Sequence, residues 1–203
     1  MRLYLARHGQ TTSNVAGALD TAAPGADLTE TGRVQAQELS DRLTDIELDG
    51  ILVSNLVRTH QTAEPVAKAK NLAPREDARI KEIAGGDWEM TTDANYLRKY
   101  FEIAYGWMKG DLSGRVPGGE NGHEVLERFN AAIEESEEDS LLVVSHGMML
   151  QVWATIMVGD PAGDVLPHMT NCALGAIDGQ PGSWTLVDWY KPPVPGEETS
   201  QIA

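Results

Sequence analysis

The chain of 203 residues contains a single cysteine and no long apolar run. One cysteine, Cys172, excludes an internal disulfide and any zinc knuckle built from paired cysteines. No stretch approaches the roughly 18 consecutive apolar residues of a membrane-spanning helix. Near the start, Arg2 and Arg7 bracket only four apolar residues, whereas a signal-peptide core needs roughly 7–15. We therefore expect a cytoplasmic protein with no membrane partner, in which Cys172 is a buried packing residue.

Basic residues are scarce relative to acidic ones. There are 16 Lys and Arg against 31 Asp and Glu, and the formal net charge is −15. Non-specific binding to nucleic acid requires a basic surface, so the charge balance argues against a nucleic-acid partner. The hydrophobic fraction of 41% supports a sizeable core. We expect a single domain over residues 1–191 and a disordered Pro- and Glu-rich tail over 192–203, and the sequence leaves a homodimer open.

Apolar segments of strand length alternate with helical patterns along most of the chain. The expected strands lie at 2–6, 50–53, 79–83, 141–145, 172–177 and 184–189. The expected helices lie at 29–43, 55–69, 93–108, 121–135 and 148–158. Thr29 is expected to cap the first of these helices. The alternation predicts an α/β fold with a mostly parallel sheet.

Two of these strands are followed by a histidine and a glycine. Arg7-His8-Gly9 comes directly after strand 2–6, and His146-Gly147 comes directly after strand 141–145. In open α/β sheets, ligands bind at the carboxyl ends of the strands. Because the chain has only five histidines, two such pairs suggest one site built from two strands.

Two further segments contribute charged side chains to this pattern. Arg58 lies on the first turn of the helix after strand 50–53, and Glu82 precedes the glycine-rich segment 85–89. Two guanidinium groups and two imidazoles form a strong anion site, and the planar guanidinium matches the paired oxygens of a phosphoryl group. One imidazole can act as the nucleophile, and a nearby carboxylic acid can protonate the leaving oxygen. Such a set can transfer a phosphoryl group without a metal ion.

Five motifs in order between residues 2 and 175 resemble the histidine phosphatase superfamily, the phosphoglycerate mutase-like proteins. They are R-H-G-x-T-x-x-N from residue 7, S-x-L-x-R-T-x-Q-T-A from 54, E-x-x-x-G-D-W-E from 82, P-G-G-E from 117 and V-S-H-G from 144. The tripeptide R-H-G alone is weak evidence for this family, but the five motifs together are highly specific to it. The resemblance implies a three-layer α/β/α fold with a mostly parallel central sheet, and no metal or cofactor.

The resemblance also implies a role for each matching residue. His8 is the nucleophile that becomes phosphohistidine. Glu82 is the proton donor to the leaving group and then the base that activates water, with Glu120 as the main alternative. The groups implied to hold the phosphoryl oxygens are Arg7, Arg58, His146, Asn14 and the N–H of Gly147. Gln10 and Thr11 are implied to line the pocket wall.

The departures from the family pattern bear on the identity of the substrate more than on the chemistry of the reaction. Met90 stands where the family usually has glycine, and Asn121 stands where serine usually follows P-G-G-E. The mutase branch usually has tryptophan at the position of Ser13 and a longer insertion around the substrate. Hydrolysis of a small phosphorylated metabolite is therefore favoured, with a phosphoglycerate mutase-type transferase or a non-catalytic phospho-ligand binding protein as alternatives.

The segment over residues 85–120 is expected to form a cap over the substrate. Its aromatic residues either wall the pocket or pack in the core: Trp88, Tyr96, Tyr100, Phe101 and Trp107. Just beyond it, His123-Glu124 approaches the H-E-x-x-H zinc motif but lacks the second histidine, so we interpret it as the start of a helix and expect no metal site.

Overall fold

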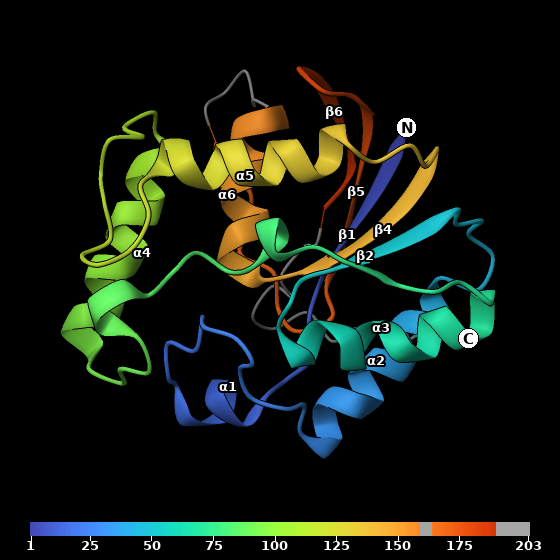
Figure 1. Cartoon of the computed structure of the whole chain (residues 1–203), viewed down its shortest axis with the longest axis horizontal. Coiled ribbons are helices and arrows are strands. Elements are labelled where there is room, and N and C mark those ends of the chain that lie inside the picture. The colour runs from blue at the N-terminus through green and yellow to red at the C-terminus, as the bar shows by residue number, and fades with distance from the viewer. Residues whose placement is uncertain (159–163, 190–203) are drawn as a thin grey trace, which may run out of the picture.

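The computed structural model describes residues 1–158 and 164–189, and a six-stranded sheet runs through the middle of this part (Figure 1). In spatial order the strands are β3 (Arg75–Glu76), β2 (Gly50–Val53), β4 (Ser140–Ser145), β1 (Arg2–Arg7), β5 (Leu174–Gln180) and β6 (Ser183–Asp188). The first four are parallel, whereas β5 is antiparallel to β1 and β6 is antiparallel to β5. The expected mostly parallel sheet is confirmed.

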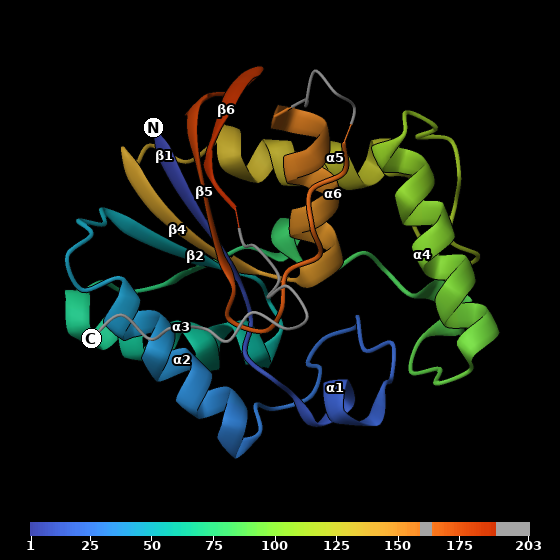
Figure 2. The same ribbon diagram turned by 180° about the vertical axis from the view of Figure 1, so that it is seen from behind.

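Helices cover both faces of the sheet, as Figures 1 and 2 show from opposite sides. The helices are α1 (Thr12–Ala16), α2 (Glu30–Arg42), α3 (Val57–Lys70), α4 (Ala94–Met108), α5 (Gly122–Glu134) and α6 (Gly147–Val158). Helices α2 and α3 lie on one face and α5 and α6 on the other, while α1 and α4 flank one end of the molecule. The three-layer α/β/α arrangement is therefore confirmed.

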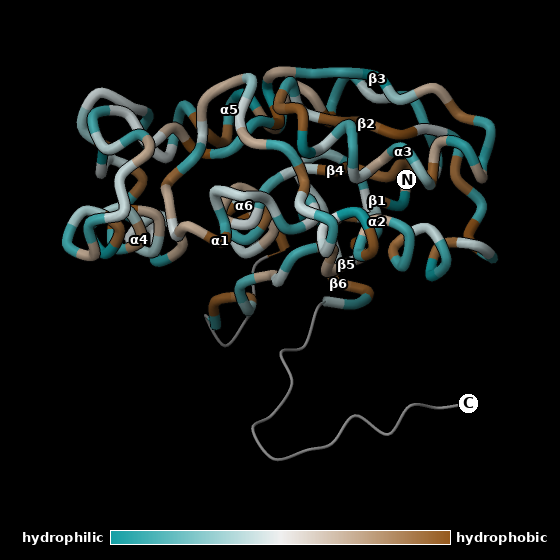
Figure 3. Tube along the Cα trace, turned by 90° about the horizontal axis from the view of Figure 1, so that it is seen from below, coloured by the Kyte–Doolittle hydropathy of each residue, from teal (hydrophilic) through white to brown (hydrophobic). Residues whose placement is uncertain are grey.

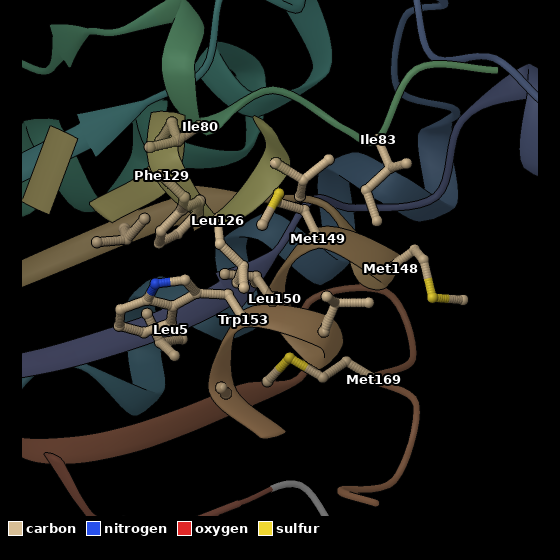
Figure 4. Packing of buried hydrophobic residues seen from close by; sticks show 14 of the residues in the cluster. Leu5, Ile80, Ile83, Leu126, Phe129, Met148, Met149, Leu150, Trp153 and Met169 are labelled. Atoms are coloured by element: carbon tan, nitrogen blue, oxygen red, sulfur yellow. The ribbon is translucent and has the colours of Figure 1, made fainter. Parts of the chain in front are cut away.

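The central strands are apolar on both faces, which explains why they are continuous hydrophobic runs in the sequence. Successive side chains of a strand point to opposite faces. In β1, Leu3 and Leu5 pack in the cluster under α5 and α6, whereas Tyr4 and Ala6 pack in the cluster under α2 and α3. Figure 3 shows the hydrophobic colouring along β2. The larger cluster contains Phe129 against Trp153, with ring centroids 4.8 Å apart (Figure 4).

One expected strand is wrong. Residues 79–83 do not pair with the sheet: Ala78–Ile80 forms a 3₁₀ turn, and the strand at this edge is the short β3. The turn is capped by Asp77, whose side chain accepts from the N–H of Arg79. The side chain of Arg128 donates to the carbonyls of Arg79 and Lys81, so a side chain takes the acceptors that a neighbouring strand would use.

The other elements match the expected ones within a few residues. Thr29 caps α2 by accepting from the N–H of Gly32 at 3.0 Å, and Cys172 is buried. The expected tail over 192–203 lies outside the described residues. No helix in the described ranges is both long and apolar enough to cross a membrane.

Candidate active site

The carboxyl ends of β1 and β4 border a cleft of about 440 Å³. These strands are parallel neighbours in which Arg7 pairs with Ser145, so the next residues, His8 and His146, lie side by side. Their ring centroids are 5.3 Å apart. The cleft is lined by Arg7, His8, Thr11, Asn14, Gly17, Ala18, Leu19, Asp20, Thr21, Arg58, Glu82, Leu97, Tyr100, Phe101, Gly147, Met148, His168 and Asn171.

Seven of the nine residues expected from the sequence line this cleft. The other two lie elsewhere. His146 is fully buried beneath the lining, beside His8. The side chain of Gln10 is turned to α2, where its Oε1 accepts from the Thr29 hydroxyl at 2.9 Å.

The tautomer of His8 follows from its backbone contact. Its Nδ1 lies 2.7 Å from the carbonyl oxygen of Gly9, and because a carbonyl can only accept, Nδ1 carries the proton. Nε2 therefore holds the lone pair of a neutral imidazole. Burial, together with the positive charges of Arg58 and Arg7, holds the pKa of His8 well below its usual value. The site therefore keeps His8 neutral, which is the nucleophilic form.

Gly9, which follows His8, and Gly32, in the first turn of α2, allow their two backbone segments to come into contact. A Cβ on Gly9 would lie 2.6 Å from the carbonyl oxygen of Gly32 in α2, and a Cβ on Gly32 would lie 2.1 Å from that of Gln10. The N–H of Gly9 is held by the Thr62 hydroxyl at 2.9 Å. This close approach fixes the turn that carries His8 against the first turn of α2.

Asn14 is oriented by a capping box at the start of α1. Its Oδ1 accepts from the N–H of Thr11, while the Thr11 hydroxyl accepts from the N–H of Asn14. The same Oδ1 also accepts from Nδ2 of Asn171 at 3.1 Å. Since Oδ1 is used twice, Nδ2 of Asn14 is the group available to donate to a ligand in the cleft.

Two arginines, Arg58 buried and Arg7 partly buried, supply the positive charge of the cleft. Arg58 is 2% exposed and donates from Nη2 to the carbonyl of Asp20 at 2.8 Å. Arg7 donates from Nη1 to the carbonyl of Met169 at 2.6 Å. Burial lowers the pKa of both guanidinium groups, and the charge of Arg58 adds to the effect on Arg7.

Several buried side-chain nitrogens around His8 have no hydrogen-bond partner among the described residues. They are Nε of Arg7, Nε and Nη1 of Arg58, and Nδ1 of His146. Nη1 of Arg58 lies 3.6 Å from Oδ1 of Asp20 in a buried ion pair, and Nε2 of His146 is 2.8 Å from the Ser54 hydroxyl. Burial, Arg58 and His8 hold the pKa of His146 well below its usual value. Unpaired buried donors are costly, and an anion bound between them would satisfy them.

Of the two candidate acids, Glu82 is the one that the fold places in the cleft. Its Oε1 accepts from the N–H of Met149 at 2.9 Å and its Oε2 from the N–H of Met148 at 3.2 Å, so the first turn of α6 fixes its position. Glu120, the alternative acid, is paired with Arg128 at 2.7 Å and does not line the cleft. The described residues contain no group of three His, Cys, Asp or Glu side chains that could hold a metal ion.

No pattern in the sequence points to four other polar residues of the cleft: Asp20, Thr21, His168 and Asn171. His168 is exposed overall, but its ring lies between two partners. Its Nδ1 is 3.0 Å from Oε1 of Gln151, which can only accept, so its Nε2 accepts from Nη1 of Arg7 at 3.2 Å. Partial burial and the Arg7 charge lower the pKa of His168 to about 4. His168 therefore acts as a neutral acceptor that holds Arg7.

Four of the five aromatic residues named above lie in the two expected places, and Tyr96, which is 42% exposed, lies in neither. Tyr100 and Phe101 line the cleft, whereas Trp107 is fully buried in the core beside α5 and α6. Trp88 stacks on Tyr96 outside the cleft lining, with ring centroids 5.8 Å apart.

Comparisons with known proteins agree with this geometry. The family model of the histidine phosphatase superfamily (branch 1) matches residues 3–192. A curated relative, the probable phosphoglycerate mutase GpmB of Erwinia tasmaniensis, is 30% identical over 93% of this chain and 90% of its own length. The solved structure of the α-ribazole phosphatase of Shigella flexneri is 30% identical, with a TM-score of 0.74 over 93% of this chain and 96% of that chain. A mycobacterial glucosyl-3-phosphoglycerate phosphatase in complex with VO3 is 25% identical, with a TM-score of 0.77 over 93% and 98%.

Proposed function

Since the chain belongs to the histidine phosphatase superfamily, we propose that it hydrolyses a phosphomonoester through a phosphohistidine at His8, without a metal ion. The observation that carries the proposal is the set of buried side-chain nitrogens on Arg7, Arg58 and His146 that have no hydrogen-bond partner among the described residues. They surround a neutral imidazole whose Nε2 lone pair is free of the backbone contact made by Nδ1. An anion site built around a nucleophile is what phosphoryl transfer requires.

The first step is an in-line displacement at phosphorus. Nε2 of His8 attacks, the new P–N bond forms, and the P–O bond to the leaving group breaks. The protonated carboxyl of Glu82 gives its proton to the leaving oxygen. Arg7, Arg58 and His146 hold the three equatorial oxygens, on which the negative charge of the transition state is spread.

The second step returns the enzyme to its starting state. The Glu82 carboxylate takes a proton from a water molecule whose oxygen attacks phosphorus. The P–N bond breaks, inorganic phosphate leaves, and His8 recovers its neutral form. The N–H groups of Met148 and Met149 keep the Glu82 carboxyl group in one place for both proton transfers.

Transfer of the phosphoryl group to a second metabolite is the alternative, since curated relatives are named as probable phosphoglycerate mutases. The two reactions share the first step and differ in the acceptor. Product analysis separates them: hydrolysis releases inorganic phosphate in proportion to substrate consumed, whereas a mutase moves the phosphate to another hydroxyl.

The test is hydrolysis of p-nitrophenyl phosphate by the wild type, with and without EDTA, and by His8→Ala. We expect EDTA to have no effect and His8→Ala to lose roughly 10⁴-fold or more of kcat, as when a nucleophile is removed. A matched control is His60→Ala, because His60 lies on α3, half-exposed and paired with Glu76, outside the cleft.

Trapping the intermediate gives a second readout. Rapid quenching into alkali should preserve an alkali-stable, acid-labile phosphoryl group on the wild type and none on His8→Ala. Full activity of His8→Ala would overturn the assignment of the nucleophile. An inert wild type across pH 4–8 would instead support a protein that binds phospho-ligands without turning them over.

A further inference from the structure

The charges of the cleft are concentrated at its base. Arg7 and Arg58 are the cationic residues of the described lining; Arg58 is buried, Arg7 is partly buried, and both lie beside His8. The other formally charged residues of the lining are Asp20 and Glu82, which are acidic. If Arg7 and Arg58 bind the phosphoryl group, no arginine or lysine of the described lining remains for a second anionic group of the substrate.

The opposite wall of the cleft is apolar and comes from α4. Leu97, Tyr100 and Phe101 contribute to it, with Met148 from α6. The Tyr100 hydroxyl is already used, because it donates to the carbonyl of Ile83 at 2.8 Å in a fully buried position. Tyr100 therefore offers its ring, not its hydroxyl, to a ligand.

Phe101 is a large apolar side chain at the rim of this wall. It lines the cleft while 46% of it remains exposed. Its ring meets that of Tyr100 edge-on, with centroids 5.6 Å apart. A concave site with an apolar wall and a few convergent polar groups is typical of small-molecule binding, and a volume of about 440 Å³ holds more than a phosphate ion.

We propose that the substrate is a phosphomonoester whose leaving group is uncharged and presents an apolar, flat face to Tyr100 and Phe101. This inference rests on the proposed function. The same lining disfavours a leaving group that carries a carboxylate or a second phosphate. Such a group would find no second arginine or lysine in the described lining, and the net charge of −15 opposes its approach at long range.

The test compares kcat/KM for three monoesters of primary alcohols: benzyl phosphate, glycerol 3-phosphate and, as the carboxylate-bearing member, 3-phosphoglycerate, whose ester is also on a primary carbon. Alkyl esters are used so that the reactivity of the leaving group differs little across the series. We expect benzyl phosphate to be the best substrate and 3-phosphoglycerate the worst, with at least a tenfold difference between them.

Variants of residues on α4 test whether this helix is responsible for the preference for benzyl phosphate. We expect Phe101→Ala to lower kcat/KM for benzyl phosphate by roughly 5- to 10-fold, mainly through KM, as an aromatic contact is lost. Its kcat/KM for glycerol 3-phosphate should fall less, so that the ratio of the two values drops. The matched control is Tyr105→Ala, because Tyr105 is an equally exposed aromatic on the same helix that does not line the cleft; it should change neither value.

A variant that adds a cation at the rim of the cleft should reverse the preference between these esters. Phe101→Arg should raise kcat/KM for 3-phosphoglycerate and lower it for benzyl phosphate, because it adds the missing cation to the rim. If all three esters are hydrolysed and 3-phosphoglycerate is as good as benzyl phosphate, the inference is overturned while the proposed function stands. If none of the three is hydrolysed while p-nitrophenyl phosphate is, the inference fails and the proposed function stands; if p-nitrophenyl phosphate is not hydrolysed either, both fail.

Discussion

Gly147 offers a sharp test of how the cleft positions its cations. It is the first residue of α6, and a Cβ built on it would lie 2.9 Å from Cε1 of His168 and 3.0 Å from Nε of Arg7. Both distances are tighter than ordinary van der Waals contact. Since Nη1 of Arg7 is held by the Met169 carbonyl and by His168, the guanidinium cannot retreat without losing at least one of these bonds.

Gly147→Ala is expected to lower activity while leaving stability nearly unchanged. Misplacing Arg7 removes one charge-assisted hydrogen bond to the phosphoryl group, which is worth about 1.5–3 kcal/mol. This corresponds to a kcat/KM that is roughly 10- to 150-fold lower. The three nearest atoms that the new Cβ would meet all belong to the flexible side chains of His168 and Arg7, not to the backbone. We therefore expect the free energy of unfolding to change little.

Gly106→Ala is the matched control for this prediction. Gly106 lies inside α4, and a Cβ there would have nothing within 4 Å. It should gain about 0.5–1 kcal/mol of stability and keep its kcat/KM. The assays are kcat/KM for p-nitrophenyl phosphate, the inhibition constant of inorganic phosphate, and urea unfolding. If Gly147→Ala keeps both kinetic constants within twofold of wild type, Arg7 does not depend on the missing Cβ and the reasoning is refuted.

Three other predictions follow from the same site. Gly32→Ala should lose about 1–3 kcal/mol in urea unfolding, because its Cβ would meet the backbone oxygen of Gln10 at 2.1 Å; unchanged stability would contradict that close approach. Glu82→Gln should lower kcat by roughly 10²- to 10⁴-fold with a smaller change in the inhibition constant of phosphate, measured in the steady state. His8 and His146 have folded-state pKa values well below their usual value, so the unfolded chain binds more protons below about pH 6.5 and stability should fall as pH drops from there towards about 5. Thermal unfolding against pH checks this, and a flat Tm across the window would contradict it.

The residues that come directly from strand ends are the ones that sequence reasoning could place. His8 and His146 follow long apolar runs, and parallel strands of one sheet end at one edge, so periodicity alone brings these residues to a common site. Arg58 follows the same logic, since β2 is hydrogen-bonded to β4 and α3 begins four residues after β2 ends.

The residues that sequence reasoning missed are positioned by contacts between distant segments. His168 belongs to a segment without helical or strand periodicity, and its neighbour in the site, Arg7, is 161 residues away. That segment is held against β1 because the N–H of Cys172 donates to the carbonyl of Arg7 at 3.1 Å. The expected strand at 79–83 failed for a related reason, since the side chain of Arg128 on α5 takes its carbonyls. Neither contact leaves a local pattern.

The partners of the charged residues explain why some of them can do chemistry while others only stabilise the fold. Arg128 and Glu120 satisfy each other at 2.7 Å, so neither charge is available to a ligand. Arg7, by contrast, is held by a carbonyl and a neutral imidazole, which fix its position without neutralising it. Glu82 is held by backbone N–H groups in the same way. Neutral partners do not fully compensate the desolvation cost of a charge that is taken out of water. The folded protein therefore carries this free-energy cost until an anion binds. A bound anion would then form the hydrogen bonds that the arginine nitrogens lack in the free protein.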